Sequence, residues 1–482
     1  MSSAVSRSAR LLVIAGVASG VGKTTVTLGL LEAFRRKGLT VQAFKVGPDF
    51  IDPGFHELVT GRPSYNLDGW MCGRTHVRAT VARHARDADL ALVEGMMGCF
   101  DGLDGTGEEG STAQVAKWLA APVVLVIDAG AQARSAAAVT LGFECFDPAL
   151  NIAAVIANRL AGETHARWVR DAIAARCRAV PVGTIPGDET LALPERHLGL
   201  VTAGEGALTP DKLKRLADLV ERSVDLDALL EMASPLRVES PGGAPPPDPP
   251  VRARIGVARD SAFCFYYRDN FALLEAAGAE LVFWSPLTAH ALPRVDGLYF
   301  GGGYPELHAA ALAANTPIRE SVRAFADAGG PIYAECGGLM YLANALEDLD
   351  GATHAMVGLL PTVVRMRPRR LTLGYTEVTF TGAAPLGAAG LVARGHEFHY
   401  SSIDPVPDAV ARVYRLCRRH GEERAEGYVV GRALMSYVHL HFASNPELAG
   451  RFVDACADPT GRSSCRPATI TVEAIAKEPT TA

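Results

Sequence analysis

The chain has 482 residues, of which 48% are hydrophobic and 21% are charged, and its formal net charge is −6. At about 150 residues per domain, this length predicts two or three domains, each large enough for a core of its own. The acidic balance provides no basic field for nucleic acid, and no apolar run approaches the about 20 uncharged residues that span a bilayer. We therefore expect neither a nucleic-acid nor a membrane partner.

Nine cysteines are scattered along the sequence without paired spacing. An odd number in a long chain fits reduced thiols better than a disulfide framework, and no CxxC pair or Cys/His cluster indicates a structural zinc. The segment before the first apolar run carries Ser and Arg but lacks the apolar core of a secretory signal. The expected compartment is the cytoplasm.

Short apolar runs alternate with longer amphipathic stretches through the first half of the chain. Such alternation predicts buried parallel strands joined by crossover helices, which is the pattern of a doubly wound α/β sheet. We expect this first domain to cover residues 1–232. Its strands are expected at Leu11–Ala15, Val41–Val46, Leu90–Glu94, Val123–Asp128, Ile152–Asn158 and Val180–Ile185.

A proline-rich segment, residues 233–252, interrupts this alternation and is expected to be a stiff linker. A second doubly wound parallel-sheet domain is then expected over residues 253–456, in tandem with the first. The remaining residues, 457–482, are rich in Pro, Thr, Ser and Ala, which predicts a disordered tail. The strands of the second domain are expected at Arg254–Ala258, Glu280–Trp284, Gly297–Phe300, Pro331–Ala334, Gly374–Phe380 and Leu434–His441.

A phosphate-binding loop follows the first expected strand: Val17-Ala-Ser-Gly-Val-Gly-Lys-Thr-Thr25. Backbone N–H groups at the start of a helix can surround phosphates, Lys23 can contact the β- and γ-phosphate oxygens, and the Thr24 hydroxyl can bind Mg²⁺. The common pattern places a glycine at position 17, whereas here the glycine is Gly16, a spacing similar to that of the dethiobiotin synthetase group. We expect ATP as a co-substrate, bound by Ser19, Gly20, Val21, Gly22, Lys23, Thr24 and Thr25.

A second reactive centre is expected at Cys336, where the apolar strand Pro331–Ala334 meets a helix that begins with Gly337. This arrangement is that of a nucleophile elbow: the turn exposes the thiol, the helix N-terminus favours the thiolate, and the Gly337 N–H faces the position of an oxyanion. The glycine loop Gly301–Gly303, in particular Gly302 and Gly303, is expected to supply a second oxyanion donor. His439, at the end of a strand, is the expected base.

Several motifs together resemble the cobyrinate a,c-diamide synthases, and the likeness extends from Leu11 to about Cys456. Few other families join this phosphate loop to this kind of glutaminase domain. The motifs are the phosphate loop continued to Gly29, Phe44-Lys-Val-Gly-Pro-Asp-Phe-Ile-Asp-Pro-Gly-Phe-His56, Asn66-Leu-Asp-Gly-Trp70, Val93-Glu-Gly-Met-Met-Gly-Cys-Phe-Asp-Gly102, Gly301-Gly-Gly-Tyr-Pro-Glu306, Arg394-Gly-His-Glu-Phe-His-Tyr400 and Tyr437-Val-His-Leu-His-Phe442.

The resemblance implies an enzyme that amidates the a and c side-chain carboxylates of a corrin acid in cobalamin biosynthesis. It would use ATP, with ammonia taken from glutamine in a class I amidotransferase domain. The chemistry is consistent, because a carboxylate lacks a leaving group for ammonia until phosphorylation makes an acyl phosphate. The expected partners are therefore small molecules, the corrin acid, glutamine and ATP, and a homodimer is left open.

Residues at the carboxyl ends of the first-domain strands are candidates for the synthetase site, because ligands collect at this edge of a doubly wound sheet. Asp49 and Glu94, together with Thr24, are the expected Mg²⁺ ligands, directly or through water. The alternative for both carboxylates is helix capping. The residues expected to contact the substrate, its phosphate or ammonia are Lys45, Asp49, Phe50, Ile51 and Asp101.

The chain departs from the general glutaminase pattern at His441, which stands where a glutamate usually completes a Cys-His-Glu triad. We therefore expect a dyad, with His439 oriented by a group that the sequence does not identify, and His441 in a packing or substrate contact. His396, Glu397 and His399 are interpreted as a hydrogen-bonded cluster at a domain interface more readily than as a metal site. Corrin carboxylates are an alternative role for the basic cluster Arg365, Arg367, Arg369 and Arg370.

Two other functions remain open at this point. The same chemistry on hydrogenobyrinate or nickel-sirohydrochlorin would need the same motifs, and cobyrate synthase is a further relative, although the Phe44–Pro53 motif favours the diamide enzyme. An alternative of another class is a nucleotide-switch protein similar to the partitioning ATPases. Those proteins carry a lysine where this chain has Ala18, and they lack a glutaminase half.

Overall fold

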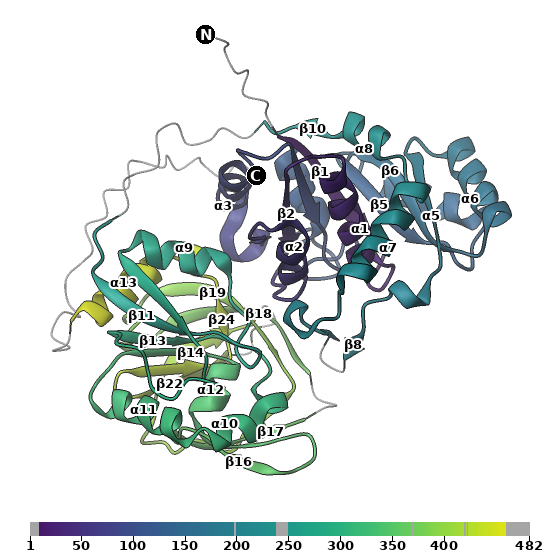
Figure 1. Cartoon of the computed structure of the whole chain (residues 1–482). Helices are drawn as coiled ribbons and strands as arrows, with labels where there is room; N and C mark the ends of the chain where they lie inside the picture. The colour runs from purple at the N-terminus through teal and green to yellow at the C-terminus, as the bar shows by residue number, and fades with distance from the viewer. Residues whose placement is uncertain are drawn as a thin grey trace, which may run out of the picture.

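The computed structural model describes residues 9–196, 199–237, 249–367, 371–418, 421 and 423–458. It has two lobes, each built around its own large sheet (Figure 1). Parts of three sequence-based expectations lie outside the described residues: the centre of the proline-rich segment, Arg369 with Arg370, and the predicted tail beyond 458.

The first lobe contains a parallel sheet in the order β3-β2-β4-β1-β5-β6-β7. The six strands expected from the apolar runs are all present, and the two further strands of this sheet, the edge strand β3 and the short β10 (Ser234–Pro235), were not expected. Their interiors are almost completely buried because helices cover both faces, which explains why these strands have continuous apolar sequences. The strands are β1 (Arg10–Gly16), β2 (Val41–Val46), β3 (Tyr65–Leu67), β4 (Leu90–Glu94), β5 (Val123–Asp128), β6 (Ile152–Leu160) and β7 (Val180–Pro186).

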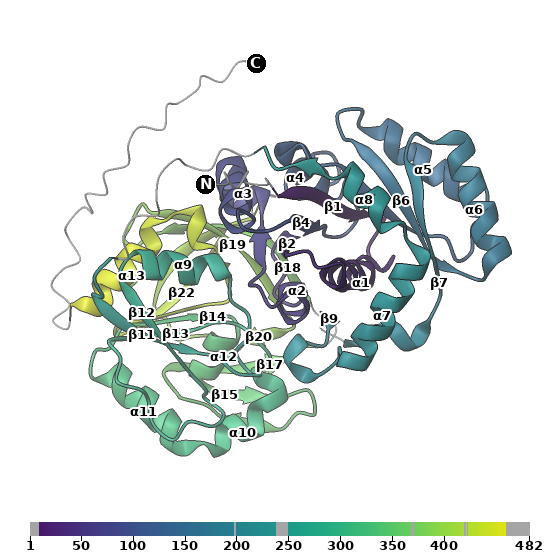
Figure 2. The ribbon, with the colours of Figure 1, turned by 45° about the horizontal axis from the view of Figure 1, so that its top comes forward.

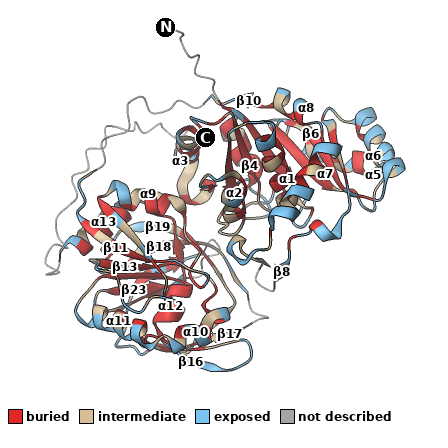
Figure 3. Ribbon diagram, in the orientation of Figure 1, coloured by how far each residue is buried: buried red, intermediate tan, exposed pale blue. Residues whose placement is uncertain are grey.

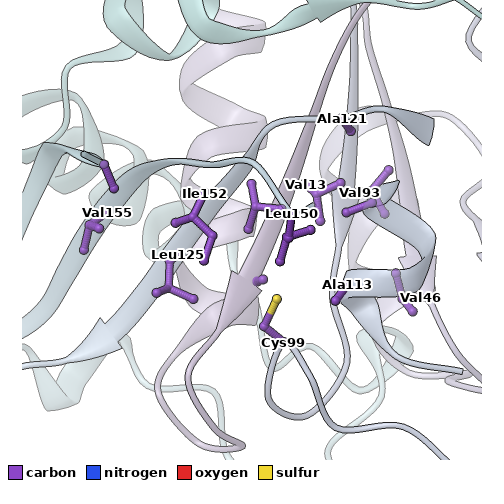
Figure 4. Packing of buried hydrophobic residues seen from close by; sticks show 14 of the residues in the cluster. Val13, Val46, Val93, Cys99, Ala113, Ala121, Leu125, Leu150, Ile152 and Val155 are labelled. Carbon is purple, nitrogen blue, oxygen red and sulfur yellow. The ribbon is translucent and has the colours of Figure 1, made fainter. Parts of the chain in front are cut away.

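Two separate cores lie on the two faces of this sheet. On one face, β1, β4 and β5 contribute Val13, Val93 and Leu125 to a core that Figure 4 shows from close by. The helices packed on that face are α3 (Gly69–His84), α4 (Thr112–Leu119), α5 (Ser135–Phe146) and α6 (Glu163–Arg176). The opposite face is covered by α1 (Lys23–Arg36), α2 (Asp52–Thr60), α7 (Pro210–Ser223) and α8 (Leu226–Met232).

The second lobe contains a ten-stranded sheet in the order β12-β11-β13-β14-β23-β22-β21-β18-β19-β24. The strands from β12 to β23 are parallel, whereas each neighbouring pair from β23 to β24 is antiparallel. Its strands are β11 (Ala253–Ala258), β12 (Ala279–Trp284), β13 (Gly297–Phe300), β14 (Ile332–Glu335), β18 (Thr372–Phe380), β19 (Val392–His399), β21 (Ala411–Cys417), β22 (Glu423–Val430), β23 (Ala433–Ser436) and β24 (His439–Leu440).

Smaller elements complete both lobes. A second sheet of four strands, β15 (Ala343–Glu347), β16 (Thr353–Ala355), β17 (Leu360–Met366) and β20 (Ser401–Ile403), lies beside the large one. A short ladder joins β8 (Glu195–Arg196) to β9 (Gly199–Leu200). The helices of the second lobe are α9 (Arg268–Ala276), α10 (Ala309–Ala314), α11 (Thr316–Asp327), α12 (Gly337–Leu342) and α13 (Glu447–Ala457). Four 3₁₀ turns are η1 (Glu189–Leu191), η2 (Ala203–Glu205), η3 (Pro305–His308) and η4 (Phe442–Ser444).

The tandem α/β prediction is confirmed, with three corrections. The second sheet is mixed and not wholly parallel, because its later strands return through direct antiparallel connections without crossover helices. The expected strand Leu434–His441 is two strands, β23 and β24, which pair with different neighbours. The proline-rich segment begins inside the first sheet, where β10 (Ser234–Pro235) pairs with Leu11 and Arg10 of β1.

The two lobes meet along α2, α3 and the loop after β2 on one side and α9, β18 and β19 on the other (Figure 2). Tyr375 donates a hydrogen bond from its hydroxyl to the buried Asp68 carboxylate at 2.7 Å. Arg394 donates to the Trp70 carbonyl oxygen at 2.8 Å, and its guanidinium lies 4.8 Å from the centre of the Trp70 ring. Buried residues continue through both sheets (Figure 3), so each lobe has a core independent of this contact. No helix among the described residues is long and apolar enough to cross a membrane.

One buried side chain stabilises the end of the second sheet. Asn270 of α9 is fully buried, donates from Nδ2 to the Leu440 carbonyl oxygen at 2.9 Å, and accepts from the Phe442 N–H at 2.8 Å. We expect Asn270→Ala to lower the free energy of unfolding of the second lobe by about 2–4 kcal/mol, because it leaves two buried backbone groups unpaired.

Urea unfolding of Asn270→Ala and of a control variant, followed by near-ultraviolet circular dichroism, measures this effect. The matched control is Asn445→Ala, at a less buried position, which removes a bond to the Val392 carbonyl oxygen and one from the Glu447 N–H. We expect it to cost below about 1.5 kcal/mol. An equal loss of unfolding free energy in both variants would contradict the stabilising role assigned to Asn270.

Candidate active sites

The phosphate loop connects β1 to α1 at the centre of the first sheet. Gly20 and Gly22 adopt φ angles of 76° and 94°, which L side chains rarely adopt. A side chain at Gly22 would also collide with the Asn158 amide, and one at Gly16 would lie 2.9 Å from the Lys23 side chain. The absence of a side chain at Gly16 therefore leaves room for the Lys23 side chain. This explains why the glycine stands at position 16, one residue before its place in the common pattern.

Lys23 is directed back over the loop. Its Nζ donates to the carbonyl oxygens of Ala18 at 3.0 Å and Met97 at 2.5 Å. Burial, followed by repulsion from Lys45, lowers the pKa of Lys23 to about 8. The ammonium is thus still charged at neutral pH, and a phosphate that replaced these carbonyl oxygens would gain a buried charge-assisted hydrogen bond.

A buried ionic network lies below the loop. The Thr24 hydroxyl donates to Glu94 Oε1 at 2.7 Å, and Lys45 Nζ lies 3.0 Å from the same oxygen and 2.5 Å from Asp52 Oδ2. Glu94 Oε2 is 2.7 Å from Nε2 of His56. Burial by itself disfavours the charged form of both Lys45 and Glu94. The nearby carboxylates outweigh it and raise the pKa of Lys45, while Lys45 and His56 outweigh it at Glu94 and lower the pKa of that carboxyl group. The network brings together Thr24, Lys45 and Glu94 of the predicted set.

Two members of this network were missed from the sequence, although the Phe44–His56 motif contains both. Asp52 and His56 lie in the first two turns of α2, one helical turn apart, and this spacing places both side chains on one helix face. Asp49 instead accepts hydrogen bonds at Oδ1 from the N–H groups of Ile51 and Asp52. Asp49 thus caps the start of α2, which was its alternative reading, while its charge still acts on Lys45.

The other predicted synthetase residues have separate positions. Ile51 is half-buried and packs against the core below α1 and α2. Asp101 accepts from the Gly98 N–H at 2.8 Å and is exposed, with its charge acting on Lys23. Beyond the loop, a cavity of about 510 Å³ borders Gly22, Thr25 and Asn158. Asn158 donates to the Val21 carbonyl oxygen at 2.9 Å, and sequence reasoning had not selected it.

Cys336 occupies the predicted turn between β14 and α12, with φ of 47° and ψ of −100°. A non-glycine residue with this backbone is strained, which is typical of nucleophiles held at a tight elbow. A Cβ added to Gly337 would lie 3.1 Å from the Gly303 N–H nitrogen. The two glycines are therefore close neighbours, with the Gly337 N–H hydrogen-bonded to the thiol and Gly303 lining the same cavity as Cys336.

The surroundings of the thiol disfavour the thiolate. Burial, followed by the charge of Glu306, raises the pKa of Cys336 well above its ordinary value. The Gly337 N–H at the start of α12 acts in the opposite direction, as expected of a helix N-terminus, but burial outweighs it. Cys336 Sγ donates a hydrogen bond to the Phe398 carbonyl oxygen at 3.8 Å.

His439 is buried against the oxyanion loop. A side chain at Gly302 would collide with its ring, so the imidazole packs directly on the glycine that precedes Gly303. Burial lowers the pKa of His439 well below the ordinary value, which keeps the ring neutral and able to accept a proton. Its Nδ1 is buried without a hydrogen-bond partner among the described residues. His399 lines the same cavity as Cys336.

Rings, and not a carboxylate, surround His439. His396 of the neighbouring strand lies parallel to it at 5.0 Å between ring centres, and His396 Nδ1 is 2.8 Å from the Tyr267 hydroxyl. Phe50, from the loop after β2 in the first lobe, lies 5.0 Å from His439 and 4.7 Å from Tyr267. A first-lobe residue predicted to contact substrate thus packs against the predicted base of the second lobe.

The remaining candidates have structural partners. His441 Nε2 lies 3.8 Å from Asp269, and its ring packs on Tyr267 at 4.4 Å, as a packing role predicts. Glu397 is paired with Arg418 at 2.6 Å and Arg424 at 2.5 Å, so the interpretation of this segment as a bonded cluster agrees with its contacts. Arg365 pairs with Asp404 at 2.9 Å and with Glu347, which engages the described part of the basic cluster within its own lobe.

Comparison with known families assigns each lobe. Residues 12–201 match a model described as CobQ/CobB/MinD/ParA nucleotide binding domain, and residues 254–447 match a CobB/CobQ-like glutamine amidotransferase domain. Among solved structures, the chain is similar to PurLQS from Thermotoga maritima with 19% identity over 42% of this chain, 96% of that one, and a TM-score of 0.32.

Curated relatives match over nearly their full length. The chain is 49% identical to a cobyrinate a,c-diamide synthase from Syntrophotalea carbinolica over 92% of this chain and 98% of the relative. It is 43% identical to that of Priestia megaterium, over 93% and 97%, and 42% identical to that of Salmonella typhimurium, over 92% and 97%. The chain therefore belongs to the cobyrinate a,c-diamide synthase family of glutamine-dependent carbon–nitrogen ligases.

Proposed function

We propose that the protein amidates the a and c carboxylates of cobyrinate, using ATP and ammonia released from glutamine. The substrate named for its relatives supports the corrin acid, and the two sites support the division of chemistry between the lobes. The observation that carries the proposal is the occurrence, in one chain, of a nucleophile elbow at Cys336 and a phosphate loop above the Thr24–Glu94–Lys45 network.

In the glutaminase half, Cys336 Sγ would attack the carboxamide carbon of glutamine. Its proton passes by way of His439 to the leaving nitrogen, so that ammonia departs and a thioester remains. Water then hydrolyses the thioester to glutamate and restores the thiol. The N–H groups of Gly303 and Gly337 would stabilise the oxyanion in both steps, since they are fixed backbone donors in a water-poor site.

In the synthetase half, a carboxylate oxygen of cobyrinate would attack the γ-phosphorus of ATP, which forms an acyl phosphate and releases ADP. Ammonia then attacks the acyl carbon, a proton is lost from nitrogen, and phosphate departs. Lys23 would contact the transferred phosphoryl group in place of the Ala18 and Met97 carbonyl oxygens. Lys45 would neutralise the charge that gathers beside Asp52 and Glu94.

The donor set below the loop fits Mg²⁺. Thr24, Asp52 and Glu94 offer hard oxygen atoms close together, with Thr24 Oγ1 3.3 Å from Asp52 Oδ2 and 2.7 Å from Glu94 Oε1. The described residues contain no cage of three or more His, Cys, Asp or Glu side chains, which suits an ion that retains waters and binds phosphates. Thr24, Asp52 and Glu94 would hold it, with Asp49 nearby, and it would neutralise phosphate charge.

The division of labour predicts a selective loss in Cys336→Ala. We expect glutamine-dependent amidation to fall by about 10³-fold or more, because the nucleophile is absent. Amidation from ammonium chloride is expected to remain within about threefold, because the synthetase lobe has its own core. Counting amides added to cobyrinate by mass spectrometry, with each nitrogen source, measures both. An equal loss from both sources would refute the separation of the two sites.

Lys23→Ala tests the opposite half. Removing the ammonium that would contact the phosphates is expected to lower amidation from glutamine and from ammonium alike by at least about 100-fold. The matched control is Lys37→Ala, whose exposed ammonium pairs with Asp227 at the far end of α1, and it should change the rate less than twofold. Amidation from ammonium that survives in Lys23→Ala would contradict the proposed site.

The Phe50 contact predicts a difference between the two activities. In Phe50→Ala the ring that packs on His439 is missing, so kcat/KM for glutamine is expected to fall about tenfold, the equivalent of a contact of about 1.4 kcal/mol. Phe146→Ala, which removes a 73% exposed ring, is the control. If Phe50→Ala instead depresses ammonium-dependent amidation as strongly as the glutamine reaction, Phe50 acts on the corrin substrate and does not position His439.

The choice of tetrapyrrole is tested separately. Cobyrinate, hydrogenobyrinate and nickel-sirohydrochlorin incubated with the enzyme, ATP, Mg²⁺ and ammonium should differ in the number of amides gained, with two added to cobyrinate. Addition of two amides to a rival acid, with none to cobyrinate, would move the proposal to that substrate.

A further inference from the structure

The cavity beside Cys336 contains a carboxylate that the proposed chemistry does not use. Gly303, Glu306, Cys336 and His399 are among the residues that line it. Glu306 is the last residue of the Gly301-Gly-Gly-Tyr-Pro-Glu motif and lies in the turn η3, which follows the oxyanion loop directly. The same segment therefore presents an oxyanion donor and a carboxylate to one cavity.

Glu306 is 8% exposed, its carboxylate accepts a hydrogen bond from its own backbone N–H, and no cation of the described residues forms an ion pair with it. Its neighbours around the cavity are largely apolar, with Phe265, Met340 and Met366 among them. A buried carboxylate without a cation is costly, because neither water nor an opposite charge compensates it. Burial raises the pKa of Glu306 to about 7, which agrees with a site that awaits a positive group.

Glutamine carries one positive group, its α-ammonium, at the end of the molecule opposite the carboxamide. A bound glutamine must place its carboxamide carbon at Cys336 Sγ and its oxygen towards Gly303 and Gly337. The α-ammonium then remains in the same small cavity, where the lining carboxylate is that of Glu306. This inference rests on the proposed glutaminase reaction. We propose that Glu306 binds the α-ammonium of glutamine and so selects glutamine from other primary amides.

This contact has a consequence for the nucleophile. The charge of Glu306 is the second cause, after burial, that holds the pKa of the Cys336 thiol high. An ammonium paired with Glu306 cancels that charge, so glutamine itself removes part of the opposition to the thiolate. The arrangement keeps the thiol protonated in the free enzyme and lowers its pKa when the correct substrate is present.

The test compares glutamine with 4-carbamoylbutanoate, which is glutamine without its α-ammonium. The enzyme hydrolyses both to a dicarboxylate, glutamate or glutarate, and mass spectrometry measures each product in the presence of Mg²⁺ and ATP. For the unaltered enzyme we expect kcat/KM to be about 10- to 100-fold higher for glutamine, as for a buried charge-assisted hydrogen bond.

Glu306→Gln should erase this preference. We expect kcat/KM for glutamine to fall about 10- to 100-fold, mainly through KM, while the value for 4-carbamoylbutanoate changes less than about threefold. Glu306→Asp, which keeps the charge, should retain part of the preference. The matched control is Glu320→Gln on the exposed face of α11, for which the two substrates keep their unaltered ratio.

Two results would overturn the inference. If the unaltered enzyme hydrolyses both substrates equally well, the ammonium is not recognised. If Glu306→Gln lowers both activities by the same factor, Glu306 supports only the shape of the cavity. Amidation of cobyrinate from ammonium, measured in the same preparations, is independent of either result, and its failure in the unaltered enzyme would count against the proposed function instead.

Discussion

The carboxyl edges of two sheets meet at the boundary between the lobes, and the remaining features of the structure depend on that meeting. In a doubly wound sheet, loops that bind ligands leave the carboxyl ends of the strands. The phosphate loop follows β1, Asp49 and Phe50 follow β2, and Cys336 follows β14. Phe50 is one residue at which the two edges touch, because its ring packs on His439 and on Tyr267.

This contact gives a physical reason for the absence of a triad carboxylate. His441 occupies the sequence position at which a glutamate usually completes the triad, and its ring lies near Asp269. His76 of the first lobe lies 3.5 Å from the same aspartate. His439 is held by packing between His396, Gly302 and Phe50. Because rings from both lobes orient His439, its geometry depends on the position of the first lobe. A carboxylate on the same strand as His439 would orient it independently of that position.

The sequence predicted well what depends on local pattern. Continuous apolar runs identified the six main strands of the first sheet because both faces of that sheet are covered, and turn glycines identified the two loops. The strands β21 and β22 were missed, since they mix exposed with buried residues and carry charges such as Arg415 and Glu423. Whether a sheet is parallel or mixed depends on long-range pairing, which a local pattern does not contain.

The same distinction applies to the sites. Spacing alone brought Lys23, Thr24 and Glu94 to attention, and the structure places Thr24 and Glu94 in one network. The sequence could not show that Asp49 caps α2 while Asp52 faces Lys45, because the roles of the two carboxylates depend on where the helix begins. Nor could it show that Phe50 crosses to the other lobe, or that Glu306 shares a cavity with Cys336.

The central claim is that ammonia made at Cys336 is used within the same molecule. The most direct test supplies glutamine labelled with ¹⁵N in its amide together with an excess of unlabelled ammonium, and measures the isotope content of the amides formed on cobyrinate. The account predicts amides enriched in ¹⁵N above the ammonium pool of the solution. An isotope content equal to that of the pool would contradict it, because the two sites would then act as separate enzymes.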